Sequence, residues 1–79
     1  MTALEIVKNK IKNLYETNPN IRINVTLSHP KIIFRNDPVT IKAVYPHIFI
    51  IEEYTSGKAK THTLQYTDIL TKQIEIIDK

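Results

Sequence analysis

The sequence predicts a mainly β fold in which one N-terminal α-helix precedes five short strands. Apolar residues recur at helical spacing before Pro19, and beyond it they alternate with polar residues as strands require. The run Ile48–Ile51 is apolar throughout, so its strand presents apolar side chains on both faces and each face needs cover. With 79 residues, the economical arrangement is a small five-stranded barrel of SH3-like or Sm-like type, with the helix covering one open end or face.

The helix is expected from Thr2 to about Glu16. Thr2 and Glu5 have the spacing of a capping box, which satisfies two backbone N–H groups at a helix start. Asn18-Pro19 ends the helix, because the residue before proline is disfavoured in the α region. One side of the helix is apolar, and Ile6 lies off it; the apolar stripe consists of Leu4, Val7, Ile11, Leu14 and Tyr15.

The first two strands follow from alternation and from one proline. Residues 21–27 alternate, with Ile21, Ile23, Val25 and Leu27 facing inward, and a turn is expected over Ser28–Lys31. The second strand begins at Ile32, is interrupted at Asn36-Asp37-Pro38 and resumes at Val39, so Pro38 marks a bulge, a bend or an edge. Past this point one face is expected to carry Val39, Ile41, Ala43 and Tyr45.

The remaining strands form a hairpin and a final return. The third strand is expected over residues 47–54, with Ser56-Gly57 closing the hairpin and the fourth strand over residues 60–66. His62, Leu64 and Tyr66 then share one face. Residues 67–70 fit a single helical turn, and a fifth strand spans residues 71–77. We expect one domain over residues 1–79, with the helix in residues 1–17 and the barrel in residues 21–77.

Composition narrows the functional classes. Eleven Lys and Arg residues against eight Asp and Glu give a formal net charge of +3, which does not by itself indicate a nucleic-acid surface. Cysteine is absent, so disulfides and thiolate chemistry are excluded. No apolar run reaches the ~18 residues of a membrane span, and the N-terminus lacks the order of a signal peptide. We expect a cytoplasmic protein with no membrane partner.

Catalytic and metal-binding patterns are not recognisable. The three histidines form no closely spaced pair, so we predict no metal site. Glu52 and Glu53 are adjacent in a strand and point to opposite faces, which prevents them from acting as a facing carboxylate pair. Asp68 fits a side-chain acceptor at the start of the helical turn. The chain has one glycine and lacks nucleophile-elbow, P-loop and dinucleotide fingerprints, so we predict no catalytic residue, no cofactor and no enzyme.

Two segments resemble the Veg family of small proteins from Gram-positive bacteria. Residues 45–51, Tyr-Pro-His-Ile-Phe-Ile-Ile, resemble the YPxxFxI signature of that family. Residues 65–71, followed by the apolar strand from Ile74, resemble its SYxDVLT segment and final strand, so the resemblance spans about residues 41–77. It implies an SH3-like barrel and a cytoplasmic, non-enzymatic regulator linked to biofilm formation. The chain departs from the family at residues 27–35, which contain no glycine where the family has a glycine-rich basic segment.

Two functional hypotheses follow. The first is a small regulatory adaptor that acts by binding another protein, as the resemblance and the catalytically empty sequence indicate. The second is a nucleic-acid-binding barrel that contacts the phosphate backbone through Arg22, Lys31, Arg35 and Lys42. Aromatic side chains also have two interpretations, as core residues whose hydroxyls reach the rim or as a stacking surface for bases; they are Tyr45, Phe49, Tyr54 and Tyr66.

Self-association is also expected. By strand parity Ile48 and Ile50 lie on the face opposite Phe49 and Ile51. Val44 and Ile77 likewise lie opposite the core faces of their own strands. The barrel interior can accommodate the apolar residues of only one of these two faces. The helix stripe is too narrow to cover all of the other set, so we expect a homodimer whose interface includes the outer face of the third strand. The alternative is a monomer in which the helix docks over Ile48 and Ile50.

Overall fold

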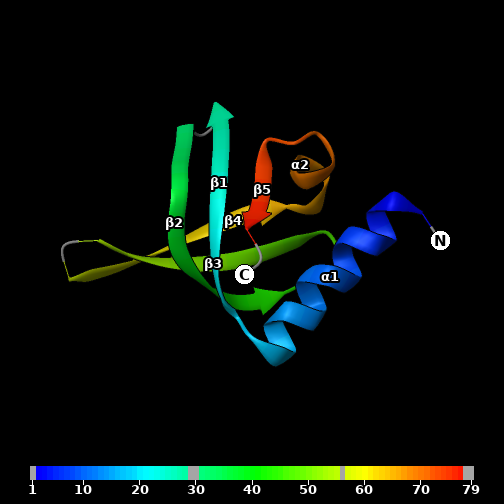
Figure 1. The fold of residues 1–79 in the computed structure, drawn as a ribbon, viewed down its shortest axis with the longest axis horizontal. Coiled ribbons are helices and arrows are strands. Elements are labelled where there is room, and N and C mark those ends of the chain that lie inside the picture. Colours follow the sequence, from blue (N-terminus) through cyan, green and yellow to red (C-terminus); the bar gives the residue numbers. More distant parts are fainter. Residues whose placement is uncertain (1, 29–30, 56, 78–79) are drawn as a thin grey trace.

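The computed structural model describes residues 2–28, 31–55 and 57–77. Within these ranges the elements follow the predicted order of one helix, four strands, one helical turn and a last strand (Figure 1). The bounds are α1 Ala3–Thr17, β1 Asn20–Ser28, β2 Lys31–Val44, β3 Ile48–Thr55, β4 Lys58–Gln65, α2 Tyr66–Leu70 and β5 Ile74–Ile77. The predicted turns at 28–31 and 56–57 include residues 29–30 and 56, which lie outside the described residues.

All five strands belong to one antiparallel sheet of order β4-β3-β2-β1-β5. The first four strands form a meander, and β5 returns to pair with β1. Over the described residues no ladder joins β4 to β5, so the sheet remains open at these two edges. The mainly β architecture with an N-terminal helix is therefore confirmed, whereas closure into a barrel is not.

β2 is bent by a bulge just before Pro38, which confirms the predicted disturbance. Between the pairs Ile23–Asp37 and Val25–Phe34, two residues of β2 lie opposite one residue of β1. Asn36, one of the two, has a φ of 53°, and its backbone N–H donates to Asn24 Oδ1 over 2.6 Å. The extra residue reverses the alternation of β2. Even-numbered Phe34 is therefore buried before the bulge, and odd-numbered Val39 and Ile41 are buried after it. Figure 1 shows the two halves of β2 running in different directions.

A second bulge in β2 corrects the predicted face of Tyr45. Ile41 pairs with Ile51 and Ala43 pairs with Ile50, which leaves Lys42 as an extra residue in β2. Beyond Lys42 the alternation reverses again. Val44, expected on the outer face, packs against the core, and Tyr45, expected in the core, has 49% of its surface exposed. Both expectations were wrong because simple alternation across residues 39–45 takes no account of an inserted residue.

The core lies inside the bend of the sheet. Phe49 and the Tyr66 ring stack with centroids 5.3 Å apart at an interplanar angle of 24°. The predicted inward residues of β1 are confirmed, because Ile21, Ile23 and Val25 are buried, while Leu27 is half-buried. The buried hydrophobic side chains of the described residues are Ile11, Ile21, Ile23, Val25, Phe34, Val39, Ile41, Phe49, Ile51, Leu64, Tyr66 and Ile74.

α2 connects the edge strand β4 to β5 and departs from one prediction. It begins at Tyr66, and its N-cap residue Gln65 makes no side-chain hydrogen bond; the expected acceptance of a backbone N–H by the Asp68 carboxylate is not found among the described residues. The backbone carbonyl of Asp68 instead accepts from the Gln73 N–H over 2.9 Å, closing the turn into β5. A helix of five residues is too short to be stable by itself, and this one is fixed by its contacts with α1, β4 and β5.

α1 packs mainly against β2 and α2. The predicted capping box is present, since Thr2 Oγ1 accepts from the Glu5 N–H and the Glu5 carboxylate accepts from the Thr2 N–H, each over 3.2 Å. Ile11 has only 1% of its surface exposed and anchors the apolar side, while Tyr15 at the edge of that side is 41% exposed. Ile6 is 55% exposed, in agreement with its predicted place off the stripe. Neither helix of the described chain has the length and apolar character needed to span a membrane.

Removal of the Ile11 side chain tests how α1 is held. We expect Ile11→Ala to lower the free energy of unfolding by about 2–4 kcal/mol, because it leaves a cavity between helix and sheet. Ile6→Ala makes the same change at an exposed site of the same helix and should alter the free energy of unfolding by no more than about 0.5 kcal/mol. Urea denaturation followed by circular dichroism measures both, and equal losses in the two variants would contradict the described docking.

The Tyr66 hydroxyl couples α2 to the end of β2. It donates a hydrogen bond of 2.7 Å to the backbone carbonyl of Tyr45, and 1% of the Tyr66 surface is exposed. Burial raises the pKa of the Tyr66 phenol above its ordinary value of 10.0, because the charged phenolate is poorly solvated inside the protein.

Alkaline pH should therefore destabilise the fold through Tyr66. Above about pH 10 the unfolded chain has lost the Tyr66 proton while the folded protein keeps it, so the free energy of unfolding falls as the pH rises through the folded-state pKa. We expect Tyr66→Phe to reduce this slope and Tyr54→Phe, at a site 72% exposed, to leave it unchanged. Urea titrations at several alkaline pH values measure the slopes, and a wild-type slope in Tyr66→Phe would refute this origin.

Candidate functional site

The four predicted basic residues are exposed but do not form one compact patch. Arg22 belongs to β1, whereas Lys31, Arg35 and Lys42 are distributed along β2. Lys31 and Lys42 are separated by roughly 36 Å of extended strand at about 3.3 Å per residue, and the bulges bend that path. The structure brings Arg22 near the bulge that contains Arg35, and it leaves Lys31 and Lys42 towards opposite ends of β2.

Two of these cations have structural contacts at the bulges. Arg22 Nη1 donates to the backbone carbonyl of Asn36 over 2.9 Å, which supports the first bulge. Lys42, the inserted residue of the second bulge, has its Nζ 3.9 Å from Glu52 Oε1. An exposed pair at this distance contributes little to stability. These contacts explain why long cationic side chains suit both positions without any ligand.

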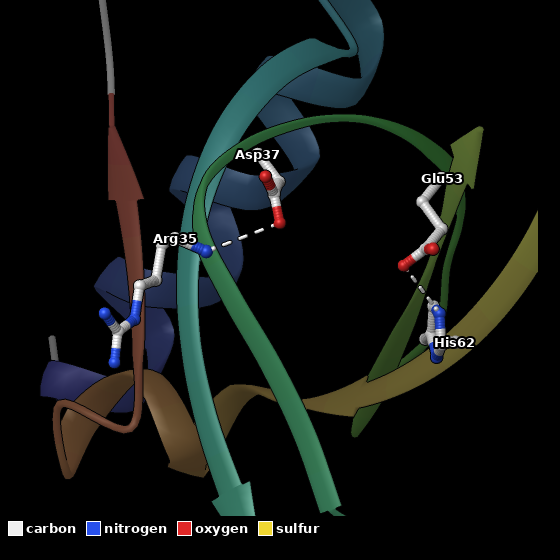
Figure 2. Close-up of polar contacts among 4 residues, drawn as sticks. All are labelled: Arg35, Asp37, Glu53 and His62. Atoms are coloured by element: carbon white, nitrogen blue, oxygen red, sulfur yellow. Dashed lines mark hydrogen bonds and ion pairs between the residues drawn. The ribbon is translucent and has the colours of Figure 1, made fainter. Parts of the chain in front are cut away.

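A histidine–carboxylate pair lies between β3 and β4. His62 Nε2 is 3.1 Å from Glu53 Oε2, and the imidazole meets the Phe34 ring edge-on at a centroid distance of 5.3 Å. Figure 2 shows Glu53 and His62 pointing toward each other, while the Arg35 guanidinium points away from Asp37. The Asp37 carboxylate accepts instead from the Arg35 backbone N–H over 3.4 Å.

This pair has a structural explanation. A histidine–carboxylate pair serves catalysis when it activates an adjacent nucleophile, whereas His62 contacts Phe34 and thereby ties β2 to the β3–β4 hairpin. Among the described residues no three His, Asp or Glu side chains are grouped to hold a metal ion. The sequence contained the signal for this pair, since Glu53 shares a face with Ile51 and His62 shares one with Leu64, but the hairpin register was needed to bring them together.

A groove lies between α1 and the end of β2. Its volume is about 440 Å³, and we call it the tyrosine groove. Tyr15 and Tyr45 contribute half-exposed rings from the two opposing elements. Figure 1 shows the last part of β2 ending against α1. The lining consists of Lys8, Asn9, Lys12, Tyr15 and Glu16 of α1 together with Val44, Tyr45, Pro46 and Tyr66.

Backbone contacts hold the groove in shape. The Tyr45 carbonyl accepts from the buried Tyr66 hydroxyl, and the Tyr45 N–H donates to the Ile48 carbonyl over 2.9 Å. Both polar backbone groups of Tyr45 are therefore occupied, and its ring is presented from a fixed backbone. The sequence did not predict this groove because Tyr15 and Tyr45 were assigned to the apolar side of the helix and to the core.

A wider hollow of about 690 Å³ lies beside β1 and includes Arg22, Pro38, Tyr54 and Ile77. Tyr54 is 72% exposed there and is therefore a surface residue, not a core residue. The hollow ends at Ile77, next to residues 78–79, which lie outside the described residues.

A family model described as "Biofilm formation stimulator VEG" matches residues 2–77. The match includes α1 and β1 in addition to the two segments that carry the resemblance in the sequence. No curated protein and no solved structure matches the chain significantly. Of the stretch from Tyr45 to Ile51, Phe49 and Ile51 are buried in the core, whereas Tyr45 and Pro46 are exposed at the tyrosine groove. Because the family model covers nearly the entire sequence, this chain belongs to the Veg family of biofilm formation stimulators.

Proposed function

We propose that this chain is a cytoplasmic, non-enzymatic regulator of biofilm formation that acts by binding another protein. The family description supports the regulatory role. The observation that carries the binding mechanism is the tyrosine groove, which is lined by two half-exposed tyrosines, one from α1 and one from the segment that follows β2. Tyrosine is enriched at protein interfaces because it supplies a large apolar contact together with a polar hydroxyl at a low cost in side-chain entropy.

The strand order also supports an SH3-like fold as the scaffold of this site. β5 returns to pair with β1, and α2 carries the chain from the β4 edge to the β5 edge. The bent sheet wraps around one core, as a small barrel does, with the helix packed at the end of β2. In this scaffold the tyrosine groove is built on the helix and on a strand end rather than on a long loop.

Nucleic-acid binding is the weaker alternative. A phosphate-binding surface requires several cations along one track, because its affinity comes from releasing counterions at many contacts. The four candidate cations are distributed around the bend of β2, and Arg22 and Lys42 already contact protein groups. Protein binding is favoured because the groove offers apolar area and a fixed backbone in one place.

A nuclease-controlled pull-down tests the proposal. We expect the tagged wild-type chain to capture a defined protein from a lysate of a biofilm-forming bacterium, before and after nuclease treatment. Tyr45→Ala should lose this protein because it removes an aromatic anchor of the groove, whereas Tyr54→Ala removes an exposed tyrosine elsewhere and should retain it. Mass spectrometry identifies the captured chains. Capture of nucleic acid, with every protein lost after nuclease treatment, would favour the alternative.

Self-association through β3 and β4 is a second proposal. β4 is an edge strand that pairs with β3 in continuous register, and no strand covers its other side among the described residues. Such an edge is a template for pairing with a second copy. Ile50 lies beside this edge between Ala43 and Thr63, and α1 packs mainly elsewhere, on β2 and α2. Ile48 lines a small hollow together with Leu4, and both isoleucines are half-buried in the single chain.

A charge at Ile50 separates the dimer from the monomer. We expect multi-angle light scattering to give twice the chain mass for the wild type and one chain mass for Ile50→Lys, because the lysine would have to be buried at the interface. Ile33→Lys places the same charge at a β2 position that is 49% exposed, and it should leave the mass unchanged. Thermal unfolding must show Ile50→Lys to be folded. A wild-type mass of one chain at high protein concentration would exclude the dimer.

A further inference from the structure

We infer that the tyrosine groove binds an acidic peptide segment in an extended conformation, supplied by the partner protein. This inference rests on the proposed function, because it names the chemistry of the segment that the regulator recognises. Three features of the groove indicate such a ligand: the charge of its helical wall, the spacing of that charge, and the apolar residues of its lining.

The helical wall of the groove is positively charged. Lys8 and Lys12 are its cations, and Glu16 is its single acidic residue at the far end. Lys8 is half-buried, so part of its stem lies against the protein while its ammonium group can reach the groove. A segment with carboxylates is therefore attracted to this wall, and a basic segment is repelled by it.

The spacing of the two lysines matches an extended chain. Lys8 and Lys12 are one helical turn apart, which separates them by about 6 Å along the axis. An extended peptide places side chains on the same side at every second residue, about 6.6 Å apart. Acidic residues at positions i and i+2 can thus meet both ammonium groups, whereas acidic residues at i and i+1 point to opposite sides of the peptide.

The apolar surface accepts the side chain between the two acids. Tyr15 contributes to the lining from α1, and Tyr45 contributes to it from the end of β2 together with its neighbours Val44 and Pro46. A proline or leucine at i+1 of the peptide points away from the lysines of α1 and toward Val44, Tyr45 and Pro46. Because the Tyr45 backbone is held by Tyr66 and Ile48, the groove is formed before binding and little ordering is required.

A peptide fits these features better than a single-stranded nucleic acid. Nucleic acids also stack on tyrosines and contact lysines, but they need a longer cationic track than two side chains. The groove contains no arginine among its described residues, and arginine is the side chain best suited to bidentate phosphate contacts. An oligonucleotide therefore serves as a competitor in the binding experiment.

Fluorescence anisotropy with labelled peptides tests the inference on the full chain. The first probe is a short peptide in which glutamates alternate with proline and leucine. The second has the same composition with the glutamates adjacent in pairs, and the third replaces every glutamate with lysine. We expect the first to bind most tightly, the second to bind about tenfold more weakly, and the third not to bind. A labelled single-stranded oligonucleotide should not compete with the first probe.

Matched variants assign the binding to the groove. Tyr45→Ala should weaken the first probe about tenfold, and it keeps the structural hydrogen bonds because these use the Tyr45 backbone. Lys8→Glu combined with Lys12→Glu should abolish the preference for acidic peptides. The controls are Tyr54→Ala and the pair Lys58→Glu with Lys60→Glu, which change exposed residues outside the groove. Both controls should bind as the wild type, and thermal unfolding confirms that each variant folds.

The outcomes separate this inference from the proposed function. Equal binding of the acidic and basic peptides, equal losses in Tyr45→Ala and Tyr54→Ala, or displacement by the oligonucleotide would overturn the acidic-peptide groove. A pull-down that still captures its protein with Tyr45→Ala would place the interface elsewhere and leave the regulatory mechanism intact. Peptide binding with no protein captured would support the groove and count against the proposed function.

Discussion

The fold depends on the two bulges of β2. A straight strand of this length would carry its core face in one direction and could not enclose a core with so few residues. The first bulge, at Asn36, bends the strand, and the second, at Lys42, reverses its alternation before the turn into β3. Phe34, Val39 and Val44 therefore contact one core although regular alternation would separate them. The exposure of Tyr45 is the consequence of the second insertion.

The elements were predictable because each has a local cause. The capping box, Pro19 and the alternation of β1 give α1 and β1 without tertiary information, and the helical turn before β5 was also expected. The sides of β2 were less predictable. Pro38 indicated a disturbance near the first bulge, but nothing around Lys42 distinguishes an inserted residue from a regular strand residue. An error of one residue there exchanged Val44 and Tyr45 between core and surface.

The candidate site could be predicted only in part for the same reason. The basic residues were correctly expected at the surface. The distances between them could not be predicted, because they depend on how the bulges bend β2, and the alternation of apolar and polar residues carries no information about this bend. The tyrosine groove required two facts from the folded state: the direction of Tyr45 after the second bulge, and the packing of α1 beside it. Tyr66 connects the core to the groove, since its ring packs in the core and its hydroxyl fixes the backbone of the groove at Tyr45.

The packing of α1 gives the groove a thermodynamic property of its own. Ile11 is the one fully buried residue within Ala3–Thr17, and the other apolar residues that α1 packs against the core, Leu4, Val7 and Leu14, are only partly buried, so the helix lies at the periphery of the core. Local release of a peripheral helix requires less free energy than global unfolding, and a released α1 removes one wall of the groove. The apparent affinity for any ligand is then scaled by the fraction of molecules in which the helix is docked. Affinity can therefore be tuned by substitutions under the helix that never touch the ligand, and a bound ligand would in turn slow amide hydrogen exchange along α1.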